Sequence, residues 1–70
     1  MEQIDVRVPI TLGQFLKVAN LADTGGQARL IIAEGLVRVN GEVEMHRSHN
    51  LADGDIVSVD RLTLQVRACN

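Results

Sequence analysis

The pair Asn40-Gly41 constrains the fold of this chain more than any other feature of its sequence. Asparagine and glycine readily adopt the two positive φ angles of a two-residue hairpin turn. Short apolar segments flank the pair, over 36–39 and 42–44, and each is broken by charged residues. The sequence therefore predicts a β-hairpin centred on Asn40-Gly41.

Two helices are predicted before this hairpin, at about 11–20 and 25–34. Each begins at a threonine that a glutamine follows three residues later, which is the spacing of a capping box. The two pairs are Thr11 with Gln14 and Thr24 with Gln27. Gly35 stands where a helix C-terminus favours glycine, so the second helix is expected to pass directly into the hairpin.

Apolar side chains at helical spacing predict the buried face of each helix. They are Leu12, Phe15, Leu16 and Ala19 in the first helix and Ala28, Ile31 and Ile32 in the second. Ile10 and Phe15 also occupy the two positions of a hydrophobic staple at the start of the first helix. We therefore expect Phe15, the one aromatic residue of the chain, to lie in the core.

Further strands are predicted at 4–8, 56–59 and 62–66, where apolar residues alternate with polar ones or form a short β-branched run. Residues 46–50 show no periodicity and are expected to form an exposed loop, and residues 53–55 a turn. The order of the elements predicts one α+β domain spanning 1–70, with a helix–turn–helix pair packed on a small, mostly antiparallel β-sheet.

Composition excludes several classes of protein. No apolar run approaches the roughly 18 residues of a membrane span, and the first residues lack a secretory pattern. The single cysteine, Cys69, cannot form an internal disulfide. These features predict a cytoplasmic chain that does not associate with membranes. The net charge of −2 does not indicate nucleic-acid binding, so any such surface requires basic residues gathered in space.

The start of the second helix is one candidate binding feature. Unpaired amides and the partial positive charge of a helix N-terminus attract phosphate. Gly25 and Gly26 place no side chain in the way of a close approach, and Arg29 follows one turn later. The alternative interpretation is that the two glycines only permit a sharp turn between the helices.

A second candidate is the cationic cluster of His46, Arg47 and His49, which a solvated loop would also explain. The histidines would gain positive charge as the pH falls below about 6.5. They lack the cysteine or nearby carboxylate partner of a metal site, so no metal is expected. Lys17 and Arg38 are predicted on polar faces of the first helix and of the hairpin.

Catalytic groups are not apparent in the sequence. Ser48 and Ser58 lack a base with an orienting partner, and Glu42 and Glu44 resemble the charged residues that protect a sheet edge. The chain is therefore predicted not to be an enzyme and to use no cofactor.

Several of these motifs occur together, in the same order, in one known family. They are Leu12…Phe15-Leu16-Lys17, Thr24-Gly25-Gly26-Gln27-Ala28-Arg29…Ile32…Glu34-Gly35, Val37-Arg38-Val39-Asn40-Gly41-Glu42 and Leu51…Gly54-Asp55…Val57. The arrangement resembles the S4 RNA-binding domain over roughly 10–60, and most closely its small stand-alone bacterial members. That domain is named after a ribosomal protein and also occurs in pseudouridine synthases and tyrosyl-tRNA synthetases.

The resemblance implies an S4-like fold, the αL motif, that binds structured RNA, either rRNA or tRNA. Carried over residue by residue, it implies RNA contacts at Lys17, Gln27, Arg29, Arg38, His46 and Arg47. Gly25, Gly26 and His49 complete the predicted set. Stand-alone members place several Arg or Lys residues in the loop that reads His-Arg-Ser-His-Asn here. Because this chain has fewer of them, its expected affinity for phosphate is lower.

Two other interpretations stay open. A β-grasp sulfur carrier is similarly small and acidic, but it needs a C-terminal Gly-Gly, where this chain ends Arg67-Ala68-Cys69-Asn70. The acidic balance also allows a protein-interaction module that has lost its RNA affinity. We expect a monomer, with a protein partner in RNA processing or ribosome assembly as a second candidate. The lack of an exposed aromatic platform favours folded over single-stranded RNA.

Overall fold

The computed structural model describes residues 1–69, which form two helices and seven strands. The helices are α1 (Leu12–Val18) and α2 (Gly25–Ala33). The strands are β1 (Glu2–Arg7), β2 (Ile10–Thr11), β3 (Val37–Val39), β4 (Glu42–Val43), β5 (Asn50–Leu51), β6 (Ile56–Val59) and β7 (Leu62–Cys69). None of these helices has the length and apolar character needed to cross a bilayer.

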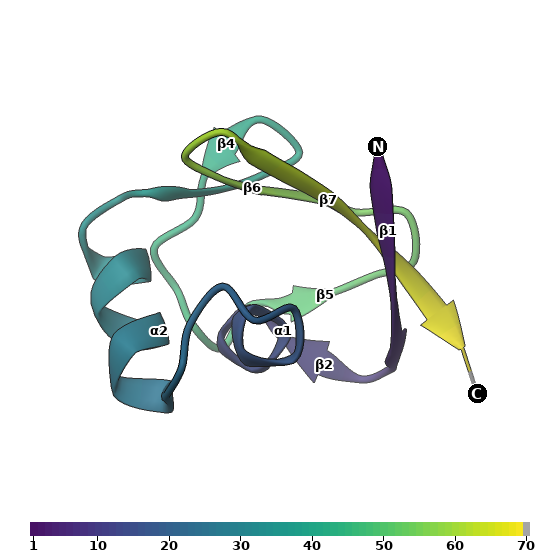
Figure 1. Ribbon diagram of the computed structural model, residues 1–70, viewed down its shortest axis with the longest axis horizontal. Helices are drawn as coiled ribbons and strands as arrows, with labels where there is room; N and C mark the ends of the chain where they lie inside the picture. The colour runs from purple at the N-terminus through teal and green to yellow at the C-terminus, as the bar shows by residue number, and fades with distance from the viewer. Residues whose placement is uncertain (70) are drawn as a thin grey trace.

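Five strands form one sheet in the order β1-β7-β6-β3-β4, in which β1 runs parallel to β7 and all other neighbours are antiparallel. The helices lie together on one side of this sheet (Figure 1). The predicted α+β fold, with two helices against a mostly antiparallel sheet, is confirmed.

A second, two-stranded ribbon of β2 and β5 was not predicted. Ile10 pairs with Leu51 and Thr11 with Asn50, so the end of the supposed 46–50 loop is a strand. Strands of two residues leave no alternating pattern in the sequence, and their pairing depends on a partner about 40 residues away. The ribbon joins the start of α1 to the segment after the hairpin.

Both helices are shorter than predicted, because each ends at a residue with positive φ. Asn20, with φ of 62°, ends the first helix: Leu21 N donates to Leu16 O at 2.8 Å and Asn20 N to Lys17 O at 3.1 Å. Gly35, with φ of 75°, ends α2 with the same hydrogen-bond pattern, here from Leu36 N to Ile31 O. The chain then enters β3. The predicted role of Gly35 is confirmed.

The capping boxes differ from each other. The box at Thr11 is complete, since its side chain accepts from Gln14 N and the Gln14 side chain accepts from Thr11 N. At α2, Thr24 accepts from Gln27 N at 3.1 Å, but the Gln27 side chain accepts from Asp23 N instead of Thr24 N. The prediction of a second reciprocal box was therefore wrong in its second bond.

The Asn40-Gly41 turn is confirmed, with φ angles of 54° and 87°. The Asn40 side chain does more than the turn requires. Its Oδ1 accepts from Ile56 N at 2.9 Å, and its Nδ2 donates to Asp55 Oδ1 at 3.1 Å. Asp55 Oδ2 in turn accepts from Ala52 N at 2.8 Å. The hairpin turn is thereby tied to the turn that begins β6.

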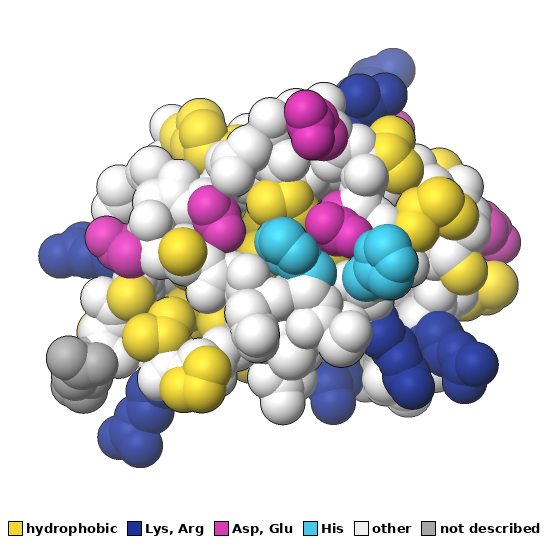
Figure 2. All heavy atoms as spheres, turned by 180° about the vertical axis from the view of Figure 1, so that it is seen from behind, with side chains coloured by type: hydrophobic (Ala, Val, Ile, Leu, Met, Phe, Trp, Pro, Cys, Tyr) yellow, Lys and Arg dark blue, Asp and Glu magenta, His cyan; other side chains and the backbone are white. Residues whose placement is uncertain are grey.

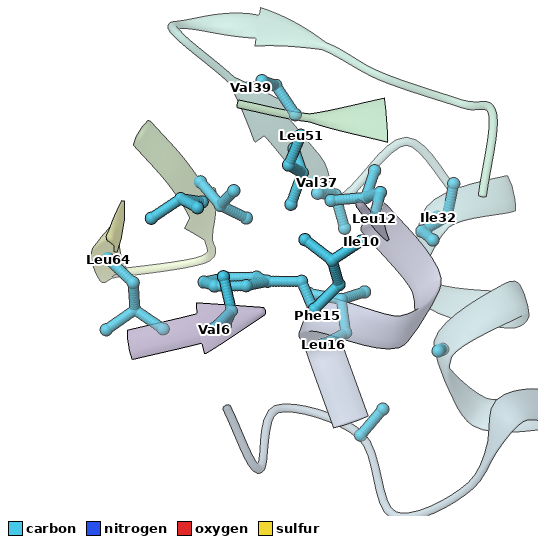
Figure 3. Close-up of a cluster of buried hydrophobic side chains, with 14 residues drawn as sticks. Val6, Ile10, Leu12, Phe15, Leu16, Ile32, Val37, Val39, Leu51 and Leu64 are labelled. Carbon is cyan, nitrogen blue, oxygen red and sulfur yellow. The ribbon is translucent and has the colours of Figure 1, made fainter. Parts of the chain in front are cut away.

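The core lies between α1 and the sheet, and every layer contributes to it. The fully buried large side chains are Phe15, Leu12, Leu16, Ile32, Val37, Val57 and Val66. Phe15 is 0% exposed, and Figure 3 shows its ring beside Ile10 and Val6, with strand residues around it. The predicted core position of Phe15 is confirmed.

We expect Phe15→Ala to lower the free energy of unfolding by about 3–5 kcal/mol, because it removes a buried ring at the centre of a small core. Urea denaturation followed by circular dichroism measures the loss. Leu30→Ala serves as the control, because Leu30 is 58% exposed and should cost no more than about 0.5 kcal/mol. A similar small cost for both would contradict the central role of Phe15.

Asn40→Gly should lower the free energy of unfolding by about 1–2 kcal/mol, because glycine keeps the positive φ but removes the side-chain hydrogen bonds. The matched control is Asn20→Gly. Asn20 also has positive φ, but its side chain makes no hydrogen bond with the described residues, so this change should be nearly neutral. Equal stabilities of the two variants would show that Asn40 acts through its backbone alone.

Candidate functional site

A hollow of about 340 Å³ lies between α1, the start of α2 and residues 47–48, and we call it the α1–α2 groove. Its lining residues are Thr11, Gly13, Gln14, Lys17, Gly25, Ala28, Arg29, Arg47 and Ser48. Three basic side chains, Lys17, Arg29 and Arg47, meet there, and none of the lining residues is acidic. The groove therefore concentrates positive charge in a chain whose net charge is −2.

The two helices position Lys17 and Arg29. On α1, Leu12, Phe15 and Leu16 face the core, which leaves Lys17 on the exposed side. On α2, Ala28 and Ile32 are buried, while the neighbouring Arg29 is exposed. The short α1–α2 connection places the N-terminus of α2 against α1, so the two cations reach the same hollow.

Gly25 and Gly26 are not required by the protein's own conformation. Neither has a positive φ. A Cβ on Gly25 would meet nothing within 4 Å, and one on Gly26 would meet only the Thr24 hydroxyl at 3.8 Å. The interpretation that these glycines serve a sharp turn therefore finds no support in the geometry. Gly25 and Gly26 leave the backbone open to an approaching group.

The 46–49 loop is held against the first turn of α1 by its backbone. Leu12 N donates to His49 O at 2.8 Å, and Gly13 N donates to Arg47 O at 3.0 Å. These amides have no partner within the helix, so the loop carbonyls satisfy them. A Cβ on Gly13 would lie 3.5 Å from Arg47 O, which shows how closely the loop approaches. This contact places Arg47 in the groove.

Glu44 binds both histidines of the loop. His46 Nδ1 lies 2.9 Å from Glu44 Oε2, and His49 Nδ1 lies 3.3 Å from Glu44 Oε1. His46 N also donates to Oε2 at 3.1 Å. The hydrogen bond from the His46 side chain, and then that from its N–H, lowers the pKa of Glu44 below the ordinary 4.5. A carboxylate only accepts, so His46 Nδ1 is the donor in its hydrogen bond to Glu44.

This arrangement corrects two expectations. The histidines were expected to lack a carboxylate partner, and Glu44 was interpreted as a solvated edge residue. Strand β4 ends at Val43, so Glu44 leaves the edge and turns toward the loop. No group of His, Cys, Asp or Glu among residues 1–69 is arranged to hold a metal ion. These contacts join residues only two and five positions apart in the chain, but they depend on the turn that the chain makes after β4, which no sequence pattern signals.

Arg38 does not reach the α1–α2 groove. It lies between Val37 and Val39, whose side chains are buried toward the helices, so it points away from them. Its Nη1 donates to Gly41 O at 3.2 Å. Arg38 therefore does not line the hollow that Lys17, Arg29 and Arg47 line, and its contact with RNA stays a prediction.

Gln27, His46 and His49 do not line the groove, and His49 lines a different hollow together with Glu44. Gln27 is exposed at the start of α2, and the His46 side chain is 83% exposed. Gln14 and Ser48 line the groove but were not predicted as site residues, since the sequence assigned Gln14 only to capping. Figure 2 shows Lys and Arg side chains along the lower edge of the molecule and others at its left and upper right edges, with the Asp and Glu side chains of this face above the lower edge.

Comparison with known proteins agrees with these features. The family model for the S4 domain matches residues 3–67. The probable ribosome maturation protein RlbA of Bacillus subtilis is 43% identical over 51 residues, which cover 73% of this chain and 72% of RlbA. The putative RNA-binding protein YbcJ of Escherichia coli is 36% identical over 59 residues, or 84% of each chain.

Two solved structures share the fold. The solution structure of Escherichia coli YbcJ, described as revealing an αL motif involved in RNA-binding, superposes with a TM-score of 0.73 at 33% identity, covering 97% of this chain and 89% of YbcJ. The 30S ribosomal protein S4e of Thermoplasma acidophilum gives 0.57 at 22% identity, covering 83% of this chain and 29% of S4e. The chain belongs to the S4 domain family rather than to the β-grasp sulfur carriers.

Proposed function

We propose that this protein is a non-catalytic RNA-binding protein that recognises structured RNA through the α1–α2 groove. The observation that carries the proposal is the meeting of Lys17, Arg29 and Arg47 in a hollow without an acidic lining residue. Such a site suits phosphate, because guanidinium groups form charge-assisted bonds to its oxygens. The names of the relatives RlbA and YbcJ point in the same direction.

The backbone at the start of α2 supplies the second part of the proposed site. The amides of Gly25 and Gly26 lie at a helix N-terminus that no side chain shields, and such amides bind anions. Gln27 is positioned to donate a hydrogen bond from the same turn. His46 and His49 belong to the same loop as Arg47 and extend the proposed site along it. Arg38 is left out of the proposed face, because it lies beyond the sheet.

Structured RNA is favoured over single strands by the position of the one aromatic residue. Proteins that grip single-stranded bases stack them on aromatic side chains, and Phe15 is fully buried. Contacts to phosphates and to the shape of a folded RNA are what this surface can provide. We infer rRNA as the first target class and tRNA as the second, with the protein acting as a cytoplasmic monomer and a single S4 domain.

Reversing the charge of the groove should abolish most of this binding. For the parent, three to five phosphate contacts should give a log–log salt slope of roughly −3 to −4. Arg29→Glu/Arg47→Glu should lower the affinity for a hairpin RNA library more than tenfold and flatten the slope by about 2. Fluorescence anisotropy at several salt concentrations measures both quantities.

The control is Arg38→Glu/Arg61→Glu, which changes the net charge equally but alters the sheet side of the molecule. It should retain most of the affinity. If both double variants lose affinity equally, binding follows total charge and not the groove. If the folded parent binds no hairpin RNA at low salt and pH 6, the chain is better explained as a protein-interaction module.

Glu44→Gln should loosen the 46–49 loop, because one amide oxygen cannot serve both histidines. Since the folded-state pKa of Glu44 is lowered, its stabilising contribution is present above its unfolded pKa and lost as the pH falls through the folded pKa. The parent should therefore melt at a higher temperature than the variant at neutral pH. This difference should persist above the ordinary carboxyl pKa of 4.5 and disappear as the pH falls through the lowered pKa of Glu44.

Glu42→Gln is the matched control, because the Glu42 side chain makes no hydrogen bond or ion pair with the described residues. Its melting temperature should follow that of the parent at every pH. Amide exchange at Leu12 and Gly13, whose N–H groups donate to the loop, should be several-fold faster in Glu44→Gln alone. Unchanged exchange at both amides would mean that the histidine contacts do not hold the loop.

A further inference from the structure

A second hollow, of about 430 Å³, lies on the other side of α1, and we call it the α1–β1 groove. It is lined by Asp5, Val6, Arg7, Pro9, Ile10, Gln14, Lys17 and Val18. Gln14 and Lys17 line both grooves. The exposed side of α1 is therefore a ridge between two hollows, and Lys17 stands on the ridge.

The two grooves together segregate the charges of the chain. Four of its seven Lys and Arg residues line them, but only one of its nine Asp and Glu residues does. The one acid is Asp5. Its Oδ1 lies 3.6 Å from Nε of Arg67 on β7, so Arg67 partly balances its charge.

Arg7 is the basic residue that the second groove adds. It ends β1, where its neighbour Val6 is buried and its own side chain is exposed. The side chain makes no hydrogen bond or ion pair with the described residues. Arg7 is thus an exposed cation in the same groove as Lys17. Because its side chain has no such partner among the described residues, it is available to a ligand.

We propose that Arg7 binds RNA phosphate in the α1–β1 groove, so that the α1 ridge lies in the minor groove of an RNA double helix with one strand on each side. Arg29 and Arg47 then contact the first strand, Arg7 the second, and Lys17 lies between them. A helix with its side chains is about 10–12 Å across, and the minor groove of A-form RNA is wide and shallow. Charge on both flanks of one helix matches the phosphates that border that groove on both sides.

This inference rests on the proposed RNA-binding function and extends it from one strand to two. It predicts a preference for duplex over single-stranded RNA that depends on Arg7. We expect Arg7→Ala to weaken binding of an RNA hairpin stem roughly threefold to tenfold at about 50 mM salt and to flatten the salt slope by about 1. Binding of an unstructured RNA of the same length should change less than twofold.

Arg61→Ala is the charge-matched control, because Arg61 is exposed at the β6–β7 turn and lines neither groove. Arg7→Lys should recover most of the stem affinity, since it keeps the charge. Circular dichroism confirms that each variant is folded. A titration of the labelled protein with the stem, followed by NMR, should shift amides on both sides of α1, at residues 6–8 as well as at 25–29.

The outcomes separate the two proposals. If Arg29→Ala weakens stem binding while Arg7→Ala matches Arg61→Ala, the second strand contact is wrong and the α1–α2 groove stands. If Arg7→Ala weakens the stem and the unstructured RNA equally, the duplex geometry is wrong. A parent that binds neither RNA overturns both proposals. Amide shifts confined to 25–29 and 46–49 would likewise exclude the α1–β1 groove.

Discussion

The contact between the 46–49 loop and the first turn of α1 is the interaction on which the candidate site depends. A helix N-terminus leaves amides without partners, and here the carbonyls of His49 and Arg47 accept from Leu12 N and Gly13 N. The β2–β5 ribbon brings the loop to this position. Without this contact, Arg47 would not meet Lys17 and Arg29 across the groove.

The basic side chains that line the grooves and most of the acidic side chains lie on different parts of the fold. The cations that line the two grooves lie on the helices, in the 46–49 loop and at the end of β1, whereas most acids lie elsewhere on the sheet, its turns and its edge. Glu44 contacts both histidines of the 46–49 loop, but it does not line the α1–α2 groove. A net charge of −2 is therefore compatible with a locally basic face, because phosphate responds to charges within about one Debye length.

Local signals predicted the elements well wherever the cause was local. The threonine caps, Gly35 and Asn40-Gly41 each act through their immediate neighbours, and their positions were correct to within two residues. The errors came from strand and side-chain partners that no sequence pattern specifies, whether they lie near in the chain or far along it. Strands β2 and β5 are too short to leave a pattern, and the Gln27 side chain turned to Asp23 because the incoming chain places that amide within reach.

The sequence by itself determined the two helices, the hairpin, the core position of Phe15 and the S4-like arrangement, because caps, turn residues and apolar spacing act over a few residues. Only the tertiary structure decided which cations meet. Alternation along β3 sent Arg38 away from the helices, the capping of α1 brought Arg47 in, and the pairing of β1 with β7 put Arg7 beside α1. A binding surface depends on directions and distances between segments far apart in the chain, and these exist only once the core has packed.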